Sequence, residues 1–600
     1  MATARVATTI HDRDVQPLYS SGDPCGRHGA CPRHDPCGRH VRFRDILALV
    51  AKHPNRRYFM LKSIIINNLY GVDIMEEATE ICKLRLFLKL VAQIERFEDI
   101  EPLPDIDFNI RAGNTLVGFT TYAEAERAIT SKLDFDNAMG HIERKTQEVE
   151  RSFEHFHSMQ TAMNFDAELI AKVKEQVRSQ LKDLSAELDG YLASEYGIDR
   201  NSIPKKEEYE ERFTRWRQSN QPFHWFVEFY GIMKKGGFDV IIGNPPYVEY
   251  STVKGEYTLP PETYKTETCG NLYTFCMERF AALSNSTAAS GLIVPLSIIC
   301  TDRMAAVRRI LYSAYSHLWF NNYDTIPGTL FSGIVQRNSI VLASRSTGKQ
   351  EQTSKVYTTK NQKWYVSERP SLFEGVSYLH NCPQSADNPL PKISTSVELN
   401  ILSKIHAQRN PITSYTQRRS NNTLVYKRRW SYFLLFADDI RGIMLPDGST
   451  RQQQDVKTLA LQPHLDRYVF IALLSSNLFY FHYSVFSDFR HVNIADFDGF
   501  AFNYAELPVS VAHTLSTLGK TLMQSYTDNL EWRMCDYVGS IGKCQVPFYR
   551  QGASKPIIDE IDHVLAGHYG FTDEELDFII NYDIKYRMGR GNGDVGEDEE

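Results

Sequence analysis

The sequence predicts an α/β protein in which short buried strands alternate with helices along the chain. Two apolar, β-branched stretches, Phe238–Gly243 and Gly291–Pro295, each precede a helical pattern. A third stretch, residues 63–74, ends in a similar strand and leads into an apolar helix over Glu76–Val91. Strands that alternate with helices in this way indicate βαβ units and a largely parallel sheet.

The same alternation continues around these stretches. Residues 109–116 are expected to form a short strand followed by a turn, and residues 338–343 a further strand. The helices expected after the main strands cover residues 271–283 and 302–312, and residues 557–587 have a helical pattern near the end.

Changes in composition divide the chain into six segments. The charged, glycine-poor stretch after residue 120 indicates a helical insertion within the α/β domain, and the pattern becomes less regular after residue 350. The expected segments are a disordered or aberrant leader (1–41), the first part of the α/β domain (42–120), the helical insertion (121–235), the second part of the α/β domain (236–349), an α+β domain (350–550), and a C-terminal helical segment with an acidic tail (551–600).

Composition excludes several classes of protein. Hydrophobic residues make up 42% and charged residues 24% of the 600 residues, which rules out wholesale disorder, collagen-like repeats and a disulfide scaffold. The net charge is 67 − 74 = −7, but nucleic-acid binding depends on where basic residues cluster. The most apolar run, Phe470–Phe481, is too short and too interrupted for a membrane span.

The leader contains a six-residue repeat of Cys-x-x-His that begins at Cys25, Cys31 and Cys37. Cysteine and histidine together suggest zinc. The alternative is a low-complexity leader, and we favour it because the repeat has no core and no loop long enough to fold around an ion. No metal site is therefore predicted.

The tetrapeptide Asn244-Pro245-Pro246-Tyr247 follows the buried strand Phe238–Gly243 directly, where ligands bind in open parallel sheets. The carbonyls of Asn244 and Pro245 can accept hydrogen bonds from an exocyclic amine, which makes its delocalised lone pair available for methylation. Tyr247 offers a flat face for a base that has left the duplex. The alternative is a simple proline turn after a strand.

These residues resemble the catalytic motif of adenine-N6 DNA methyltransferases. Together with residues 68–74 and 113–116, they resemble the large methylases of type IIG restriction–modification and BREX phage-exclusion systems, from about residue 42 to the end. The resemblance implies a Rossmann-like class I methyltransferase sheet, S-adenosyl-L-methionine as cofactor and double-stranded DNA with a flipped adenine as substrate. It also implies a cytoplasmic enzyme of a prokaryote.

The resemblance assigns roles to individual residues. The catalytic residues would be Asn244, Pro245, Pro246 and Tyr247. Asp73, followed by Ile74, would bind the cofactor's ribose hydroxyls, and Asn114 would contact its adenine amine. Phe331 would be a second aromatic against the flipped base. The alternatives are a helix-start acid for Asp73 and core packing for Phe331.

The chain departs from the family before Asp73. The family has a first strand and a glycine-rich D-P-x-C-G-S-G loop before this position. Here only Asp23–Gly29 is weakly similar to the loop, and it lacks the glycine spacing that lets backbone approach a ligand. We therefore expect an N-terminally truncated methylase that binds the cofactor weakly or not at all. An N-terminal fragment or other defence-system subunits would then be partners.

Within the segment 350–550, the resemblance implies a target-recognition domain. Residues 401–436 have seven basic side chains, no acidic ones and interleaved aromatics. The expected DNA contacts are Arg418, Arg419, Lys427, Arg428 and Arg429, and the alternative is a solvated basic face. The only E-x-K, Glu143–Lys145, lies in a helical segment without a Pro-Asp partner, so no nuclease is predicted.

Two other functions stay open. One is a non-catalytic DNA-binding subunit or remnant. The other is a glutamine-modifying protein methyltransferase, which carries the same tetrapeptide in a shorter chain without a long C-terminal region.

Overall fold

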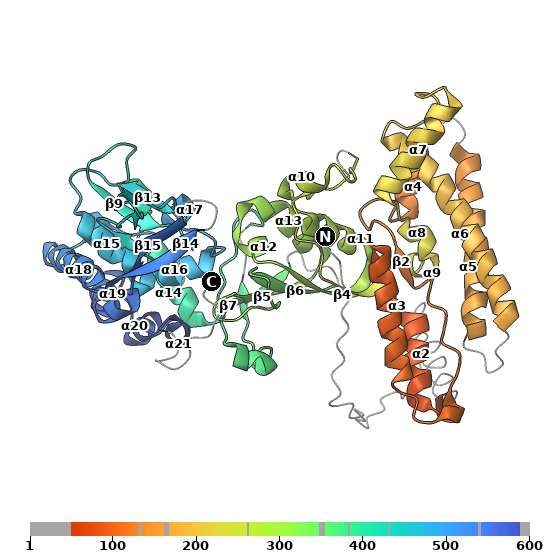
Figure 1. Cartoon of the computed structure of the whole chain (residues 1–600), viewed down its shortest axis with the longest axis horizontal. Coiled ribbons are helices and arrows are strands. Elements are labelled where there is room, and N and C mark those ends of the chain that lie inside the picture. The colour runs from red at the N-terminus through yellow and green to blue at the C-terminus, as the bar shows by residue number, and fades with distance from the viewer. Residues whose placement is uncertain are drawn as a thin grey trace, which may run out of the picture. The chain divides into compact units, whose positions relative to one another are not determined.

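The computed structural model describes residues 50–588, apart from residues 131–134, 161–166, 261–262, 347–353, 382–384, 430–431 and 538–541. The Cys-x-x-His repeat and the loop-like segment Asp23–Gly29 lie outside the described residues. The chain forms two compact units, Met1–Leu292 and Ile293–Glu600 (Figure 1).

The first unit begins with a βαβ arrangement. Strands β1 (Gly71–Asp73) and β2 (Ile110–Ala112) pair in parallel and are connected through helix α3 (Glu76–Val91). Helix α2 (Arg56–Asn68) precedes β1, and the side chain of Asn55 caps its first turn. Residues 64–66, part of the stretch that ends in the expected strand, belong to this helix, where one face of the isoleucine run is buried.

Helices occupy the chain between β2 and the next strand. They are α4 (Tyr122–Thr130), α5 (Phe135–Gln160), α6 (Ala167–Glu195), α7 (Lys206–Asn220), α8 (Trp225–Glu228) and α9 (Tyr230–Met233). The two longest, α5 and α6, lie side by side (Figure 1). Ile142, Val149 and Phe156 repeat every seven residues along α5 and are buried against α6, as an amphipathic helix requires.

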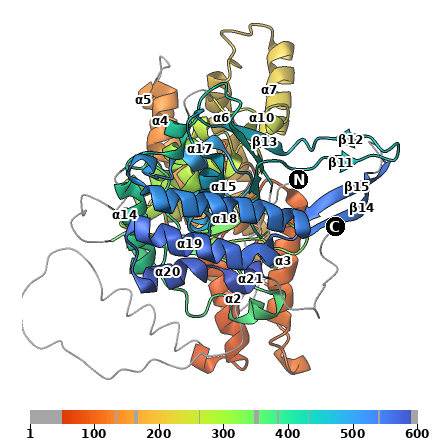
Figure 2. The same ribbon diagram turned by 90° about the vertical axis from the view of Figure 1, so that its left-hand side faces the viewer.

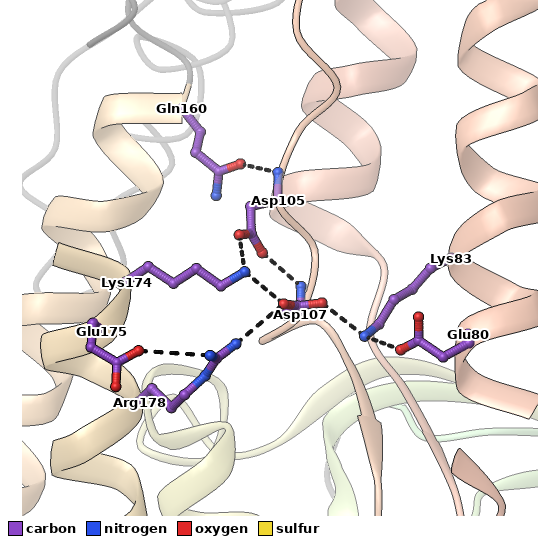
Figure 3. Close-up of polar contacts among 8 residues, drawn as sticks. All are labelled: Glu80, Lys83, Asp105, Asp107, Gln160, Lys174, Glu175 and Arg178. Carbon is purple, nitrogen blue, oxygen red and sulfur yellow. Dashed lines mark hydrogen bonds and ion pairs between the residues drawn. The ribbon is translucent and has the colours of Figure 1, made fainter. Parts of the chain in front are cut away.

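A network of charged residues holds α3, the segment before β2 and α6 together (Figure 3). Asp107 accepts hydrogen bonds from Lys83 of α3 at 2.8 Å and from Lys174 of α6 at 2.6 Å. Lys174 also pairs with Asp105, and Arg178 lies 3.5 Å from Asp107. Burial alone would raise the pKa of Asp107, but the two lysines more than offset it and lower the pKa to about 2.

Strand β3 (Phe238–Gly243) pairs in parallel with β4 (Ser284–Pro295), and α10 (Tyr250–Val253) and α11 (Leu272–Leu283) lie between them in the chain. The strand and the helix predicted here are confirmed. Strand β4 starts earlier than expected, because polar residues 284–290 also pair with β3.

In the second unit, strands follow the order β6 (Asn338–Ser344), β5 (His317–Tyr323), β7 (Lys355–Gln362), β8 (Leu379–Asn381). Strand β5 is parallel to β7 but antiparallel to β6, and β7 is antiparallel to β8. The sheet is therefore mixed, which corrects the expectation of a largely parallel sheet. The connection 324–337 contains no helix, and a parallel neighbour needs a long crossover that is usually helical.

The rest of the second unit combines helices with two small antiparallel sheets, β10-β9-β13 and β12-β11-β15-β14. The strands β11, β12, β14 and β15 extend beyond the end of helix α18 (Figure 2). The remaining elements are α12 (Ser297–Cys300), α13 (Ala305–Ala314), α14 (Ser396–Ala407), β9 (Thr423–Lys427), β10 (Phe436–Ala437), β11 (Ile443–Met444), β12 (Thr450–Arg451), β13 (Val456–Ala460), α15 (Arg467–Ser475), α16 (Asn477–Phe486), α17 (Ile494–Asp498), α18 (Val509–Asp528), β14 (Leu530–Tyr537), β15 (Gly542–Tyr549), α19 (Lys555–Tyr569), α20 (Asp573–Ile580) and α21 (Ile584–Arg587).

Among the described helices, none alone is long and apolar enough to span a bilayer. Helices α15 and α16 pass a test of length and composition only as a pair, with a bend of 60° between them. Nearly all of their residues are buried, as expected for helices at the centre of a packed unit.

Candidate functional site

The tetrapeptide Asn244–Tyr247 forms a corner at the end of β3. Pro245 is buried, whereas Asn244 and Tyr247 are partly exposed. The Tyr247 hydroxyl donates a hydrogen bond to Asn244 Oδ1 at 2.7 Å. Burial raises the pKa of Tyr247 well above its ordinary value, so this hydroxyl stays protonated as a donor. The Asn244 amide is thus held with its carbonyl oxygen toward the tyrosine.

The start of α11 fastens the chain that follows the corner. The Leu272 amide donates to the Val248 carbonyl at 2.9 Å, and the Tyr250 amide donates to the Gly270 carbonyl at 2.8 Å. Asn271, the N-cap of α11, donates through its side chain to Glu249 Oε1 at 3.2 Å. These bonds fix both sides of the segment, so the corner has a defined backbone path.

Asp73 lies at the carboxyl end of β1 and is 7% exposed. Its Oδ1 accepts a hydrogen bond from the Met75 amide at 2.9 Å, while Oδ2 is buried without a hydrogen-bond partner among the described residues. Burial raises the pKa of this carboxyl, and backbone hydrogen bonds lower it in part. A buried acceptor left open in this way indicates a place for a hydroxyl donor.

Asn114 sits beside Asp73, because the Gly113 amide donates to the Asp73 carbonyl at 2.9 Å. The Asn114 side chain accepts from the Leu116 amide through Oδ1 at 3.0 Å, and its buried Nδ2 has no partner within the described part of the chain. The open atom is a donor. It suits a ring nitrogen of adenine, whereas the amine expected from the resemblance would need an acceptor.

One hydrophobic framework supports both groups of residues. The ring of Tyr70, just before β1, contacts Phe238 at the start of β3 with 6.3 Å between centroids. Ile74, next to Asp73, and Val248, next to Tyr247, pack against the same core cluster. The Asp73–Asn114 group and the corner therefore belong to one packed part of the first unit.

Phe331 lies in the second unit. Its side chain is half-buried and packs against Tyr323, Leu330 and Trp364. These contacts support the core-packing alternative for Phe331.

The five basic side chains expected to contact DNA differ in exposure. Arg418, Arg419 and Arg429 are exposed, and Lys427 and Arg428 are half-buried. Arg428 donates to Asn493 Oδ1 at 3.1 Å.

Two of the aromatics interleaved in this segment are internal. Tyr426 is 4% exposed and Phe433 is 6% exposed. At this burial neither ring has a face free to stack on a base.

Each unit contains a cavity that the sequence did not predict. One, of about 370 Å³, lies in the first unit beside residues 116–119, with the buried Arg279 in its wall. Arg279 donates to the Tyr264 hydroxyl and to the Leu116 carbonyl. The other lies in the second unit around Arg337 and Arg490. Neither is lined by residues 244–247, and no group of three metal-ligating side chains occurs among the described residues.

Comparison with known proteins relates part of the chain to a family model. Residues 67–323 match the family model of the Eco57I restriction-modification methylase. A putative type II restriction enzyme and methyltransferase, RM.MjaORFECS2P of Methanocaldococcus jannaschii, is 27% identical over 361 residues, which cover 54% of this chain and 30% of that protein. The chain thus spans less than a third of the length of this relative.

Solved structures with some similarity include two DNA-bound enzymes. The type IIL restriction-modification enzyme MmeI in complex with DNA has a TM-score of 0.35 and 9% identity, covering 91% of this chain and 78% of that one. The ATP-dependent type ISP enzyme LlaBIII bound to DNA has a TM-score of 0.26 and 12% identity, covering 55% and 31%. The family match thus relates residues 67–323, which include Asp73, Asn114 and the Asn244–Tyr247 corner, to the Eco57I restriction-modification methylases.

Proposed function

We propose that this chain transfers a methyl group from S-adenosyl-L-methionine to the N6 amine of adenine in DNA, within a restriction–modification or phage-defence system. The observation that carries the proposal is the corner at the end of β3, where the Tyr247 hydroxyl holds the Asn244 carbonyl at 2.7 Å. This corner lies within the residues that match a methylase family.

Asn244 and Pro245 would act on the target amine. Asn244 Oδ1 accepts one hydrogen bond from Tyr247 and has a second lone pair for an N–H of the base. The Pro245 carbonyl would accept the other N–H. Two acceptors draw the nitrogen toward tetrahedral geometry, which localises its lone pair for attack. The Tyr247 ring would stack on the flipped base.

Asp73 and Asn114 would hold the nucleoside part of the cofactor. S-adenosyl-L-methionine supplies an electrophilic methyl group when it is bound. The buried Asp73 Oδ2 lacks a donor and the buried Asn114 Nδ2 lacks an acceptor within the described residues, so the pair fits ribose hydroxyls and a ring nitrogen of adenine. Ile74 would pack beside the ribose.

DNA would be bound through the second unit, where residues 350–550 would serve as the target-recognition domain. The exposed Arg418, Arg419 and Arg429 would contact phosphates, with Lys427 and Arg428 beside them. Phosphate contacts fix the position of a protein on the duplex without reading its sequence.

The test is transfer of labelled methyl from S-adenosyl-L-methionine to duplex DNA by the full chain, with and without an N-terminal fragment from a related methylase. Asn244→Ala should lower the rate roughly 100-fold or more, because preorganised groups at the reacting centre contribute that much. Glu256→Gln, an exposed residue after α10, is the matched control and should leave the rate unchanged.

The assay separates the other candidate functions. Label on protein instead of DNA would identify a glutamine-modifying methyltransferase. Absence of transfer under both conditions, with retained salt-sensitive DNA binding, would identify a DNA-binding subunit. Label on DNA that is equal in wild type and Asn244→Ala would overturn the role of the corner.

A further inference from the structure

Strands β14 and β15 form a hairpin at the edge of a small antiparallel sheet in the second unit (Figure 2). The register of the hairpin is continuous, with residues 530–537 opposite residues 542–549. Strand β14 is the end strand of the sheet, and within the described residues it pairs with β15 alone. The position of β14 therefore depends mainly on its contacts with β15.

This register places two cysteines directly opposite each other. Cys535 of β14 pairs with Cys544 of β15, and both are free thiols. Opposite residues of an antiparallel pair share one face of the sheet and have Cα atoms about 4.5–5.5 Å apart. A disulfide needs a Cα separation of about 4.4–6.8 Å, and the Cβ atoms would have to approach each other by about 1 Å. The backbone of the hairpin thus already allows a crosslink between these two residues.

The two thiols differ in their access to solvent. Cys544 is 2% exposed, and burial raises the pKa of its thiol. Cys535, on the end strand, is partly exposed. A reagent in solution would therefore reach Cys535 first, with Cys544 beside it as a second, protected thiol. Accessible cysteines that undergo reversible oxidation often have a second cysteine placed in this way.

The other described cysteines are placed differently. Cys269, Cys276 and Cys300 are buried, and Cys82 is partly exposed in the first unit. None of these four residues lies in a strand. Among the described cysteines, therefore, only Cys535 and Cys544 are held opposite each other by a strand register.

We propose that Cys535 and Cys544 are a site of reversible disulfide formation, by exchange with a small-molecule disulfide such as glutathione disulfide. The crosslink would join the end strand β14 to β15 covalently. It would fix the register of the hairpin and reduce the motion of β14, and a small-molecule thiol would reverse it.

The exchange proceeds in two steps. The Cys535 thiolate attacks one sulfur of the small-molecule disulfide, whose S–S bond breaks, and a mixed disulfide forms on Cys535 while the first small thiol leaves. The Cys544 thiolate then attacks the Cys535 sulfur, the mixed disulfide breaks and the second small thiol leaves. Two cysteine thiols are oxidised and one small-molecule disulfide is reduced to two thiols, which take up the two protons that the cysteines lose.

The test uses the full chain after reduction and removal of the reductant. Incubation with glutathione disulfide, followed by digestion without reduction and mass spectrometry, should yield a peptide pair that joins residues 535 and 544. Trypsin cleaves after Lys543, between the two cysteines, so the two peptides stay together only through the disulfide. Hydrogen exchange should slow along residues 530–537 and 542–549 in the crosslinked chain and return to its first rate after treatment with dithiothreitol.

Single variants separate the roles of the two thiols. Cys544→Ser removes the second thiol, so the glutathione adduct on Cys535 should persist at least about tenfold longer than in wild type. Cys535→Ser should leave Cys544 unmodified, because Cys544 is buried. Cys82→Ser, at a partly exposed position in the first unit, is the matched control and should crosslink like wild type. Thermal unfolding confirms that each variant is folded, and the peptide map of wild type depends on no variant.

Several results would overturn the proposal. It is wrong if wild type keeps a glutathione adduct on Cys535 without closing, or if both thiols stay unmodified while Cys82 reacts. It is also wrong if either residue is crosslinked to a different cysteine, or if the crosslink leaves hydrogen exchange in the hairpin unchanged. Because crosslinking is measured without DNA or S-adenosyl-L-methionine, the result is independent of the proposed methyl transfer.

Discussion

At the scale of single residues, the informative atoms are those that the fold leaves without partners. Asp73 Oδ2 and Asn114 Nδ2 are buried and unsatisfied among the described residues, although a buried polar atom without a partner costs about 1–3 kcal/mol. A cost of this kind at two neighbouring positions is expected where a ligand completes the bonding. The same atoms should therefore oppose stability in the free protein.

We predict that Asp73→Asn raises the melting temperature at pH 7 without cofactor and weakens S-adenosyl-L-methionine binding. Burial raises the pKa of Asp73, so its stabilising contribution is present below the unfolded pKa and is lost as pH rises through the folded pKa. At pH 7 the charge is destabilising, and asparagine removes it.

Loss of a charge-assisted hydrogen bond should weaken binding roughly 10- to 100-fold. Calorimetry and a thermal-unfolding scan measure the two effects, with the exposed Asp183→Asn as control. A lower melting temperature in Asp73→Asn would show that the carboxylate is stabilising instead.

A second prediction concerns Tyr247→Phe. The ring is kept, so binding of DNA should change little, but Asn244 loses the hydrogen bond that orients its amide. A neutral hydrogen bond contributes about 0.5–1.5 kcal/mol, so kcat for methyl transfer should fall roughly two- to tenfold while KM for DNA is nearly constant. Steady-state kinetics distinguish this outcome from a stacking defect, which would appear in KM and in Tyr247→Ala.

At the scale of elements, the ion network of Figure 3 connects helices that are distant in sequence. Lys83 of α3 and Lys174 of α6 meet on Asp107. The network therefore holds the long helices against the strand pair that carries Asp73.

We predict that Asp107→Asn lowers the melting temperature and weakens its acid dependence. The folded pKa of Asp107 is lowered to about 2, so its contribution is present above the unfolded pKa of about 4 and is lost as pH falls from there toward 2. Thermal unfolding between pH 3 and pH 7 should show that the variant has the lower melting temperature, and that this difference from wild type disappears at low pH. A difference in melting temperature that is constant with pH would show that the charge of Asp107 does not contribute to stability.

Much of the element pattern could be predicted from the sequence. Helix α3 and strand β3 have the bounds expected from local apolar patterns, since each is a buried element with a clear period. The antiparallel direction of β6 could not be predicted, because the helix-free connection 324–337 sets it. The internal positions of Tyr426 and Phe433 depend on packing between segments far apart in sequence.

The site was predictable only in outline. The residue types of the corner and of Asp73 indicated chemistry, but the bond from Tyr247 to Asn244 and the open atoms of Asp73 and Asn114 arise from three-dimensional contacts. A periodic pattern in the sequence does not show which acceptor atom of a side chain already takes a hydrogen bond.

At the scale of the whole molecule, the chain is mildly acidic but carries a local basic segment. We predict that the triple variant Arg418→Gln, Arg419→Gln, Arg429→Gln weakens DNA binding and reduces the slope of log affinity against log salt by about 2–3, since each phosphate contact contributes roughly 0.9.

Fluorescence anisotropy on duplex DNA across a range of salt concentrations gives this slope. The double variant Lys205→Gln, Lys206→Gln, at exposed positions of the first unit, is the control. An unchanged slope in the triple variant would assign the arginines to a solvated face.

The chain leaves the core of the first unit just before helix α4 and returns to it just after helix α7, at nearly the same place. The Asn114 amide donates to the Gln221 carbonyl, and the Phe223 amide donates to the Val117 carbonyl. His224 accepts from the Phe119 amide and bonds to Asp189. A protease cut in the turn between α6 and α7 would therefore yield two fragments that stay associated, and the loop that carries Asn114 would keep its shape after the chain was cut.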